Sequence, residues 1–177
     1  MIFLETGRLI LRNVEAQDGT VMFDYRNHPS CAQYQRGQQR ARNQIDQVLV
    51  WHRQDRLSTE SDCLMALTLR ETGEMVGEIV VMPTQGTFSL GYTIHYRHQR
   101  KGYAFEALSA LTEHLHRHWP HWEQICFVHP ENLASMGLLQ KLGYEDVGYI
   151  PAMESRVFGK WVHPATLQDV AQAAVMR

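Results

Sequence analysis

The chain has 177 residues, of which 44% are hydrophobic and 20% charged, and its formal net charge is −2. This length suits one domain with a sizeable apolar core, and the charge gives no electrostatic reason to expect nucleic acid or an anionic membrane as a partner. The three cysteines lie far apart and form no CxxC pair, so neither a disulfide framework nor a zinc–thiolate site is indicated. No run of about 18 apolar residues occurs, so we expect no spanning helix and a soluble, cytoplasmic protein.

The first part of the chain predicts one strand followed by two helices. Residues 8–12 form a short apolar run with polar ends, which is typical of a strand. Apolar residues between 16 and 26 indicate a helix that ends before a His-Pro pair, because the residue before a proline disfavours helical backbone. The Gln- and Arg-rich residues 29–42 show no period and are interpreted as a loop, whereas residues 43–54 carry apolar positions at helical spacing.

The second part predicts most of a sheet. Three strands joined by tight turns indicate an antiparallel meander; they cover residues 63–69, 75–82 and 88–95. A long amphipathic helix over residues 102–118 and a shorter one over 132–141 follow. The remaining strand candidates are residues 124–129, 144–150 and 155–161, and a short helix follows Pro164. The order β-α-α-β-β-β-α-β-α-β-β predicts an α+β fold with a mixed, mostly antiparallel central sheet flanked by helices.

The connection into the long helix has the composition of a phosphate-binding loop. A helix N-terminus offers unpaired backbone N–H groups and the positive end of the helix dipole, which favour an anion. Gly102 and Ala104 let the backbone approach a diphosphate closely, and Arg100 and Lys101 add positive charge. An ordinary strand-to-helix connection is the alternative. The spacing matches neither a P-loop nor GxGxxG.

Three stretches, in chain order, resemble motifs of the GNAT superfamily of N-acetyltransferases. Gln99, Gly102 and Ala104 match the acyl-CoA-binding signature Q/R-x-x-G-x-G/A. The run that begins at Asn132 is similar to the second motif, N-x-x-S-x-x-L-x-x-x-L-G-F/Y. Residues 5–12, ETGRLILR, are similar to the start of the branch that includes ribosomal-protein N-terminal acetyltransferases.

This resemblance implies a fold, a reaction and partners. It implies a single GNAT domain over residues 1–177, with a core at about 5–161 and a short C-terminal extension at 162–177. Members of the superfamily transfer the acetyl group of acetyl-CoA to a primary amine by direct attack, here on a protein N-terminus or a small-molecule amine, and need no metal. We therefore expect acetyl-CoA and an amine acceptor as partners, no nucleic acid and no membrane. A homodimer is allowed, since family members often dimerise.

The resemblance also assigns the cofactor-binding residues. The strand before the loop would offer backbone groups to the pantetheine arm as if the arm were another strand, and the loop amides would hold the pyrophosphate. The residues assigned in this way are Tyr92, Thr93, Ile94, Gln99, Arg100, Lys101, Gly102, Tyr103, Ala104 and Asn132.

Two departures from the family pattern concern catalysis. Many members place a tyrosine acid seven residues after the motif asparagine, and this chain has Leu139 there. Ser135 is the candidate acid instead, although a serine in a first helical turn also serves in capping. The glutamate that the branch often places two residues before the Gly-Tyr pair of the central strand is missing, since Ser89 and Leu90 precede that pair here. Glu78 is one candidate base, and His95, His129 and water are the others.

The acceptor and the type of activity stay open at this level. Tyr34 and Arg36 lie where the family often shapes the acceptor pocket, but the same stretch is equally a solvated loop. His114 and His118 share a helix face without a carboxylate or cysteine at ligand spacing, so no metal site is expected. A non-catalytic acyl-CoA-binding sensor or scaffold is the alternative function, and a nucleotide-phosphate-binding protein unrelated to coenzyme A is a third.

Overall fold

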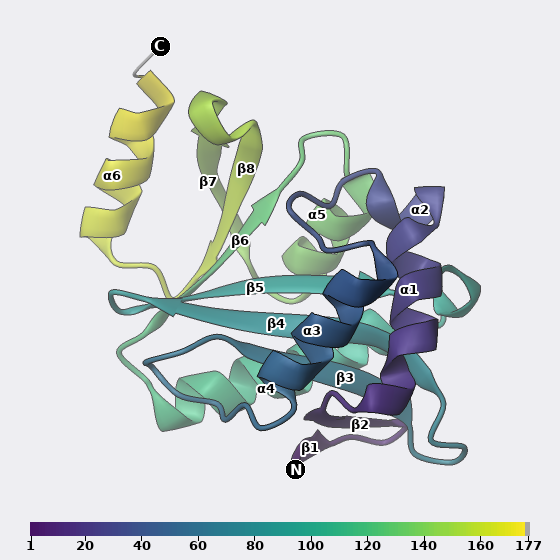
Figure 1. Ribbon diagram of the computed structural model, residues 1–177. Helices are drawn as coiled ribbons and strands as arrows, with labels where there is room; N and C mark the ends of the chain where they lie inside the picture. Colours follow the sequence, from purple (N-terminus) through teal and green to yellow (C-terminus); the bar gives the residue numbers. More distant parts are fainter. Residues whose placement is uncertain (176–177) are drawn as a thin grey trace.

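The computed structural model describes residues 1–175 and is built on an eight-stranded sheet with helices on both faces (Figure 1). The strands are β1 (Ile2–Glu5), β2 (Leu9–Asn13), β3 (Cys63–Leu69), β4 (Met75–Thr84), β5 (Thr87–Ile94), β6 (Glu123–Val128), β7 (Glu145–Ile150) and β8 (Ser155–Lys160). The helices are α1 (Gly19–Asn27), α2 (Pro29–Ala32), α3 (Arg42–His52), α4 (Tyr103–His118), α5 (Leu133–Lys141) and α6 (Pro164–Val175). None of the helices within residues 1–175 is long and apolar enough to cross a membrane.

The sheet has the strand order β1-β2-β3-β4-β5-β6-β8-β7 and opens at its centre. Every neighbouring pair is antiparallel except β5 and β6. These two strands run parallel and pair only where Thr87–Ser89 meets Glu123–Ile125. Beyond that point β6 turns away from β5, as Figure 1 shows. One edge of β5 therefore has no strand partner towards its C-terminal end.

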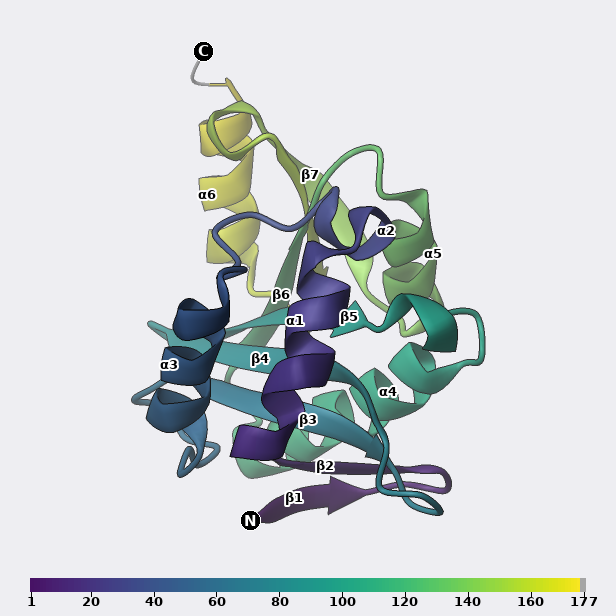
Figure 2. The same ribbon diagram turned by 45° about the vertical axis from the view of Figure 1, so that its right-hand side comes forward.

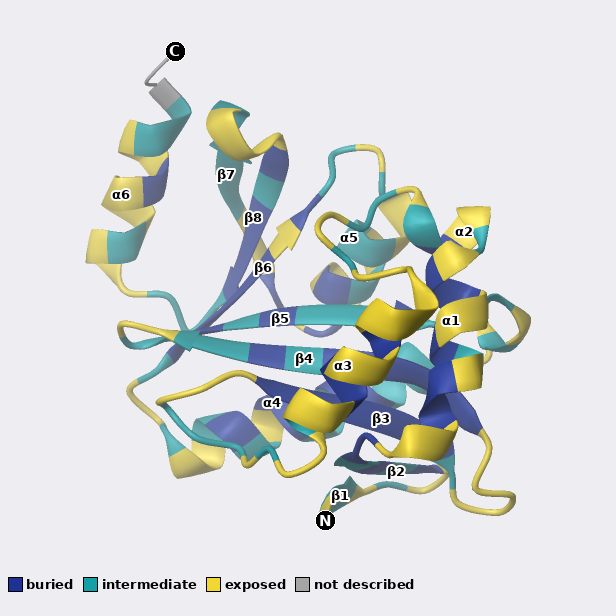
Figure 3. Cartoon of the chain, in the orientation of Figure 1, coloured by how far each residue is buried: buried dark blue, intermediate teal, exposed yellow. Residues whose placement is uncertain are grey.

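The helices cover the two faces of the sheet in separate layers. Because side chains alternate along a strand, Met65 and Leu67 of β3 pack on the α4 side, whereas Leu64 and Ala66 pack under α1 and α3. Figure 2 shows α1 and α3 on one face and α4 on the other. Burial follows the same layering, since β3 and the inward turns of α1 and α3 are dark in Figure 3 while the outer turns of these two helices are exposed. The sheet thus separates two apolar layers.

The predicted α+β fold and its order of main elements are confirmed, and two short elements were missed. Strand β1 is an edge strand of four residues, too short to show alternation. Helix α2 is a single turn that starts at Pro29, with the His28 side chain accepting a hydrogen bond from Ser30 N–H, and one turn has no period to read. The helix expected after Pro164 has 12 residues, and its Val170 packs with Ile125 and Val157 on the sheet.

Candidate active site

A cavity of about 630 Å³ lies where β5 and β6 separate. Its walls come from the end of β5, the loop before α4, the first turn of α4, one side of α5 along its length, and the chain from α2 to Gln35. Helices α2 and α5 lie next to each other beside this opening in Figures 1 and 2. All the residues that the sequence assigned to cofactor binding line this cavity except Lys101. A free strand edge and two helix N-termini thus face one cavity.

The loop before α4 has the backbone shape of an anion cradle. Arg100 and Gly102 both adopt positive φ, at 61° and 80°, and Gly102 is the N-cap of α4. Left-handed residues beside a helix start turn successive N–H groups towards one side, where they attract an anion. The dipole of α4 adds to this attraction. A non-glycine residue at positive φ is under backbone strain, and such residues are often found at binding sites. The role predicted for this loop, to hold the pyrophosphate of coenzyme A, stays a prediction.

Arg8, in the turn between β1 and β2, holds this loop in place. Its Nη1 donates to the Lys101 carbonyl oxygen at 2.8 Å, and its Nε pairs with a Glu106 carboxylate oxygen at 2.6 Å. The guanidinium also lies 4.7 Å from the centre of the Tyr103 ring. The observed contact of Lys101 with Arg8 is made through its backbone carbonyl, and its predicted cofactor role stays a prediction. Sequence reasoning missed the role of Arg8, and the only available signal was its place in the ETGRLILR motif.

The free edge of β5 presents two backbone carbonyl groups to the cavity. The Thr93 carbonyl lies against β4, so those of Tyr92 and Ile94 point the other way. Side chains already bond to both of them. Gln35 Nε2 donates to the Tyr92 oxygen at 3.2 Å, and Gln99 Nε2 donates to the Ile94 oxygen at 3.1 Å. A pantetheine arm that pairs with this edge would exchange with these amides.

Two hydroxyl groups meet across the cavity. The Tyr92 hydroxyl from β5 lies 2.6 Å from Ser135 Oγ on α5. Asn132 caps α5, since its Oδ1 accepts from the Ser135 N–H at 3.1 Å. Burial raises the pKa of Tyr92 well above its ordinary value, so this hydroxyl keeps its proton. Leu139, at the position of the family's tyrosine acid, is buried in the core. The phenol near Ser135 comes instead from the facing strand.

Glu78 lies on the other face of the sheet from Tyr92, below α1, and does not line the cavity. The side chain is buried, and its carboxylate accepts hydrogen bonds from Tyr25 at 2.7 Å, Arg26 at 2.8 Å and Gln38 at 2.9 Å. The base role of Glu78 stays a prediction. Its surroundings are those of an internal ion pair.

The Glu78→Gln variant is expected to weaken the fold more than the chemistry. It leaves the buried Arg26 without a charged partner, so the free energy of unfolding should fall by about 3 kcal/mol. Urea denaturation checks this value, and kcat measured on the folded variant should change by less than about threefold. A kcat loss of about 100-fold with unchanged stability would instead make Glu78 the base.

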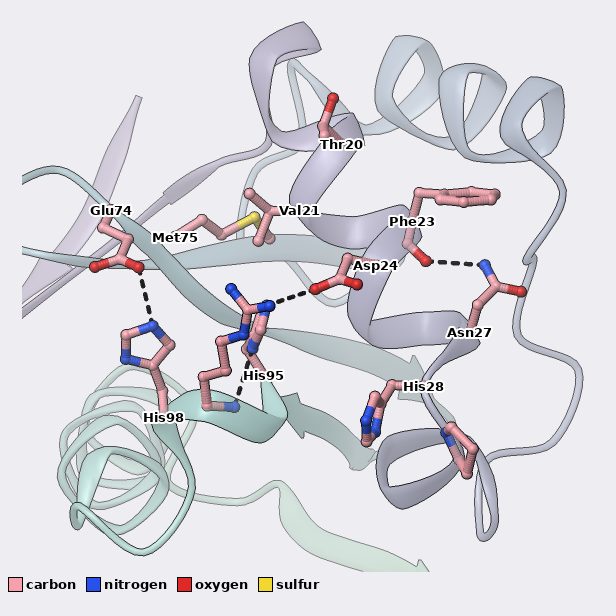
Figure 4. A pocket seen from close by; sticks show the side chains of 12 residues that line it. Thr20, Val21, Phe23, Asp24, Asn27, His28, Glu74, Met75, His95 and His98 are labelled. Atoms are coloured by element: carbon pink, nitrogen blue, oxygen red, sulfur yellow. Dashed lines mark hydrogen bonds and ion pairs between the residues drawn. The ribbon is translucent and has the colours of Figure 1, made fainter.

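The two candidate histidine bases each use Nδ1 as an acceptor. His95 Nδ1 accepts from the Arg97 N–H at 3.1 Å, and His129 Nδ1 accepts from the Glu131 N–H at 3.2 Å. The neutral ring therefore carries its hydrogen on Nε2 and has no free lone pair. His95 Nε2 donates to Asp24 at 3.1 Å, in a separate cavity of about 640 Å³ beside α1, which Figure 4 shows. This geometry favours water over either histidine as the proton acceptor.

The neutral state of His95 should appear as pH-dependent stability. Burial lowers the pKa of His95, against the partial opposition of Asp24. The unfolded chain, with a pKa near 6.5, then binds the proton more tightly than the fold does, so this stabilisation is present above about pH 6.5 and is lost as the pH falls. In His95→Asn, the amide oxygen replaces the Nδ1 acceptor without titrating. Between about pH 7.5 and 5.5, the melting temperature should fall less steeply with decreasing pH for the variant than for the wild type. Equal slopes would contradict the assignment.

A second cavity, of about 410 Å³, adjoins the first. Tyr34 and Gln35 line both cavities, so they form the shared wall. The remaining lining residues are Arg36, Phe127, His129, Met153 and Ser155. Arg36 joins two parts of the chain beside this cavity, because its Nη1 donates to the Met153 carbonyl at 2.6 Å and its Nη2 pairs with Glu154 at 3.3 Å. Both residues predicted for the substrate side thus lie at this second cavity.

A central sheet that opens between two parallel strands, beside a glycine-containing loop at a helix start, is the arrangement that the resemblance predicts for an acyl-CoA-dependent transferase. The chain matches the family model described as acetyltransferase (GNAT) domain over residues 8–145, and it therefore belongs to the GNAT acetyltransferases. The protein is an acetyl-CoA-dependent acyltransferase, and the predicted family is confirmed.

Two curated relatives are similar over most of their length. The uncharacterized N-acetyltransferase p20 of Bacillus licheniformis is 26% identical over 156 residues, which cover 83% of this chain and 84% of the relative. The uncharacterized N-acetyltransferase YnaD of Bacillus subtilis is 24% identical over 148 residues, which cover 82% and 84%.

Solved structures share the fold at low sequence identity. A GNAT-family acetyltransferase from Bacillus anthracis has a TM-score of 0.76 at 20% identity, covering 90% of this chain and 96% of that one. RimL, a ribosomal L7/L12 alpha-N-protein acetyltransferase in complex with coenzyme A, has a TM-score of 0.74 at 13% identity, covering 90% and 97%.

Proposed function

We propose that this protein is an N-acetyltransferase that moves the acetyl group of acetyl-CoA to a primary amine by direct attack. The observation that carries the proposal is the cavity at the β5–β6 opening, where an anion cradle, a free strand edge and the Tyr92–Ser135 pair converge. The two curated relatives are named as N-acetyltransferases, which supports an amine as the acceptor.

Each part of the first cavity matches one part of acetyl-CoA. The loop amides around Arg100 and Gly102 hold the pyrophosphate, with Arg8 behind them. The backbone groups of Tyr92 and Ile94 pair with the pantetheine arm. Asn132 fixes the first turn of α5, which brings Ser135 to the thioester end. Acetyl-CoA supplies the activated acyl group, and the chain supplies position and hydrogen bonds.

The Tyr92–Ser135 pair serves as the acid for the leaving thiolate. When Tyr92 donates to Ser135 Oγ, the serine hydrogen is free to point into the cavity. As the amine nitrogen bonds to the acetyl carbon and the C–S bond breaks, Ser135 gives its proton to sulfur and takes one from Tyr92. Tyr92 regains a proton through water from the nitrogen, which loses one as the amide forms. Atoms and charges then balance.

The amine must be neutral when it attacks. An amine with a pKa near 10.4 is almost wholly protonated at neutral pH, so deprotonation precedes attack. Water reaching the shared wall at Tyr34 and Gln35 is the acceptor of this proton, because the histidine lone pairs and the Glu78 carboxylate are already bonded. The rate should rise with pH until the amine is free.

Thiol release from acetyl-CoA across a panel of amines tests the function. Acceptor-dependent release that disappears in Gly102→Glu would establish the transferase. Coenzyme A binding with no release for any acceptor would favour the acyl-CoA-binding sensor instead. A chain that binds no coenzyme A would overturn both functions.

A further inference from the structure

The walls of the second cavity carry little charge. Among its lining residues, all within the part of the chain that the structure describes, Arg36 has the only formal charge, and no carboxylate is present. That guanidinium is already paired with Glu154, whose side chain is 73% exposed and lies outside the lining. The cavity therefore offers an entering cation no unpaired negative partner.

Two of the side chains that line the same cavity are large, apolar and exposed. Phe127 is 43% exposed and Met153 is 42% exposed, and they come from β6 and from the connection between β7 and β8. Large apolar side chains left open beside a cavity are a recurring feature of binding sites. The Tyr34 ring, 5.2 Å from the His129 ring, extends this surface inward to the wall shared with the first cavity.

The polar groups of the cavity suit a neutral ligand. His129 Nε2 carries a hydrogen, because Nδ1 accepts from the Glu131 N–H. The Gln35 amide, which bonds to Tyr92 and Thr93, lies at the shared wall. Such uncharged groups bond to a carbonyl or hydroxyl, whereas a second ammonium group would lose its hydration without an ionic partner.

We propose, on the basis of the proposed function, that the acceptor is a primary amine carried on an apolar, uncharged body, and that polycationic amines are excluded. The reacting amine passes Tyr34 and Gln35 to the first cavity, while its apolar substituent packs between Phe127 and Met153. A polyamine or an aminoglycoside would place further ammonium groups against this apolar surface and beside Arg36.

A pair of amines with the same five-carbon chain tests the proposal. Pentylamine and 1,5-diaminopentane differ by one terminal ammonium group, and 2-phenylethylamine adds an aromatic body. We expect kcat/KM to be about 100-fold higher for pentylamine than for the diamine, since a second desolvated charge has no partner. We expect 2-phenylethylamine to be used at least as well as pentylamine.

Phe127 offers a matched pair of variants. Phe127→Asp supplies the missing carboxylate and should reduce the preference for pentylamine to less than about tenfold. Phe127→Asn introduces a side chain of nearly the same shape as aspartate but without its charge. It should lower pentylamine use without raising diamine use. Melting temperatures confirm that both variants are folded.

The outcomes separate the two proposals. Equal or better use of the diamine by the wild type overturns the inference about the acceptor and leaves the transferase function standing. The inference about the acceptor is also overturned if diamine use rises as much in Phe127→Asn as in Phe127→Asp. No release with any of the three amines, together with intact coenzyme A binding, counts against the proposed function itself.

Discussion

Coenzyme A binding is expected to weaken at least about 100-fold when Gly102 is replaced by glutamate. A side chain at this position is forced into left-handed backbone at φ 80°, and its Cβ would lie 3.2 Å from Arg8 Nη2. The carboxylate also brings negative charge to the start of α4, where the loop amides would hold the pyrophosphate. Isothermal titration with coenzyme A measures the loss, and kcat/KM for acetyl-CoA should fall in parallel.

Gly86 provides the matched control for this substitution. It lies in the turn between β4 and β5, has φ 86°, and a Cβ there would meet nothing within 4 Å. Gly86→Glu therefore introduces the same charge and similar backbone strain away from the cradle. Its affinity for coenzyme A should stay within about threefold of the wild type. Equal losses in the two variants would mean that strain and net charge, not the cradle, explain the effect.

The Tyr92→Phe variant is expected to lower kcat about 100-fold while the affinity for coenzyme A changes little. The lost hydroxyl is the group that lies 2.6 Å from Ser135 Oγ, and the backbone of Tyr92 that faces the cavity is unchanged. Steady-state kinetics with saturating acceptor gives kcat, and titration gives the affinity. The effect should be larger for the chemical step than for KM.

Two comparisons isolate the role of this hydroxyl. Tyr144→Phe removes another buried tyrosine hydroxyl, which donates to Gln124 at 2.9 Å in the core and should affect stability alone. The double variant Tyr92→Phe/Ser135→Ala should lose little more activity than either single variant, because groups that act as one unit are not additive. Fully additive losses, or an unchanged kcat in Tyr92→Phe, would contradict the proton path.

The sequence predicted the fold well where a local rule decides the structure. Strand β3 was predicted within its observed bounds because a turn and a polar segment limit a continuous apolar run. Helix α4 was found from its apolar stripe and from the glycine that precedes it. The edge strand β1 and the one-turn helix α2 were missed, since neither is long enough to show a period.

The site was predictable only as far as backbone motifs extend. The signature at Gln99, Gly102 and Ala104 located the cradle, and all three residues line the cavity. The contact between Tyr92 and Ser135 joins residues 43 positions apart, and no local pattern records such a pairing. The same is true of Arg8, whose hydrogen bond to Lys101 spans 93 positions. Tertiary contacts of this kind depend on how the sheet opens.

The opening between β5 and β6 also bears on how the free protein avoids pairing of its open strand edge with other strands. An unpaired strand edge attracts other strands and promotes aggregation. Here the exposed carbonyl oxygens already accept hydrogen bonds from Gln35 and Gln99, and the Cys31 thiol lies 3.4 Å from the Ile94 oxygen. These side chains occupy the hydrogen-bond acceptors of the open edge. They bond to these oxygens in the free protein. Under the proposed function, the pantetheine arm of coenzyme A would displace them, so binding would exchange one set of hydrogen bonds for another.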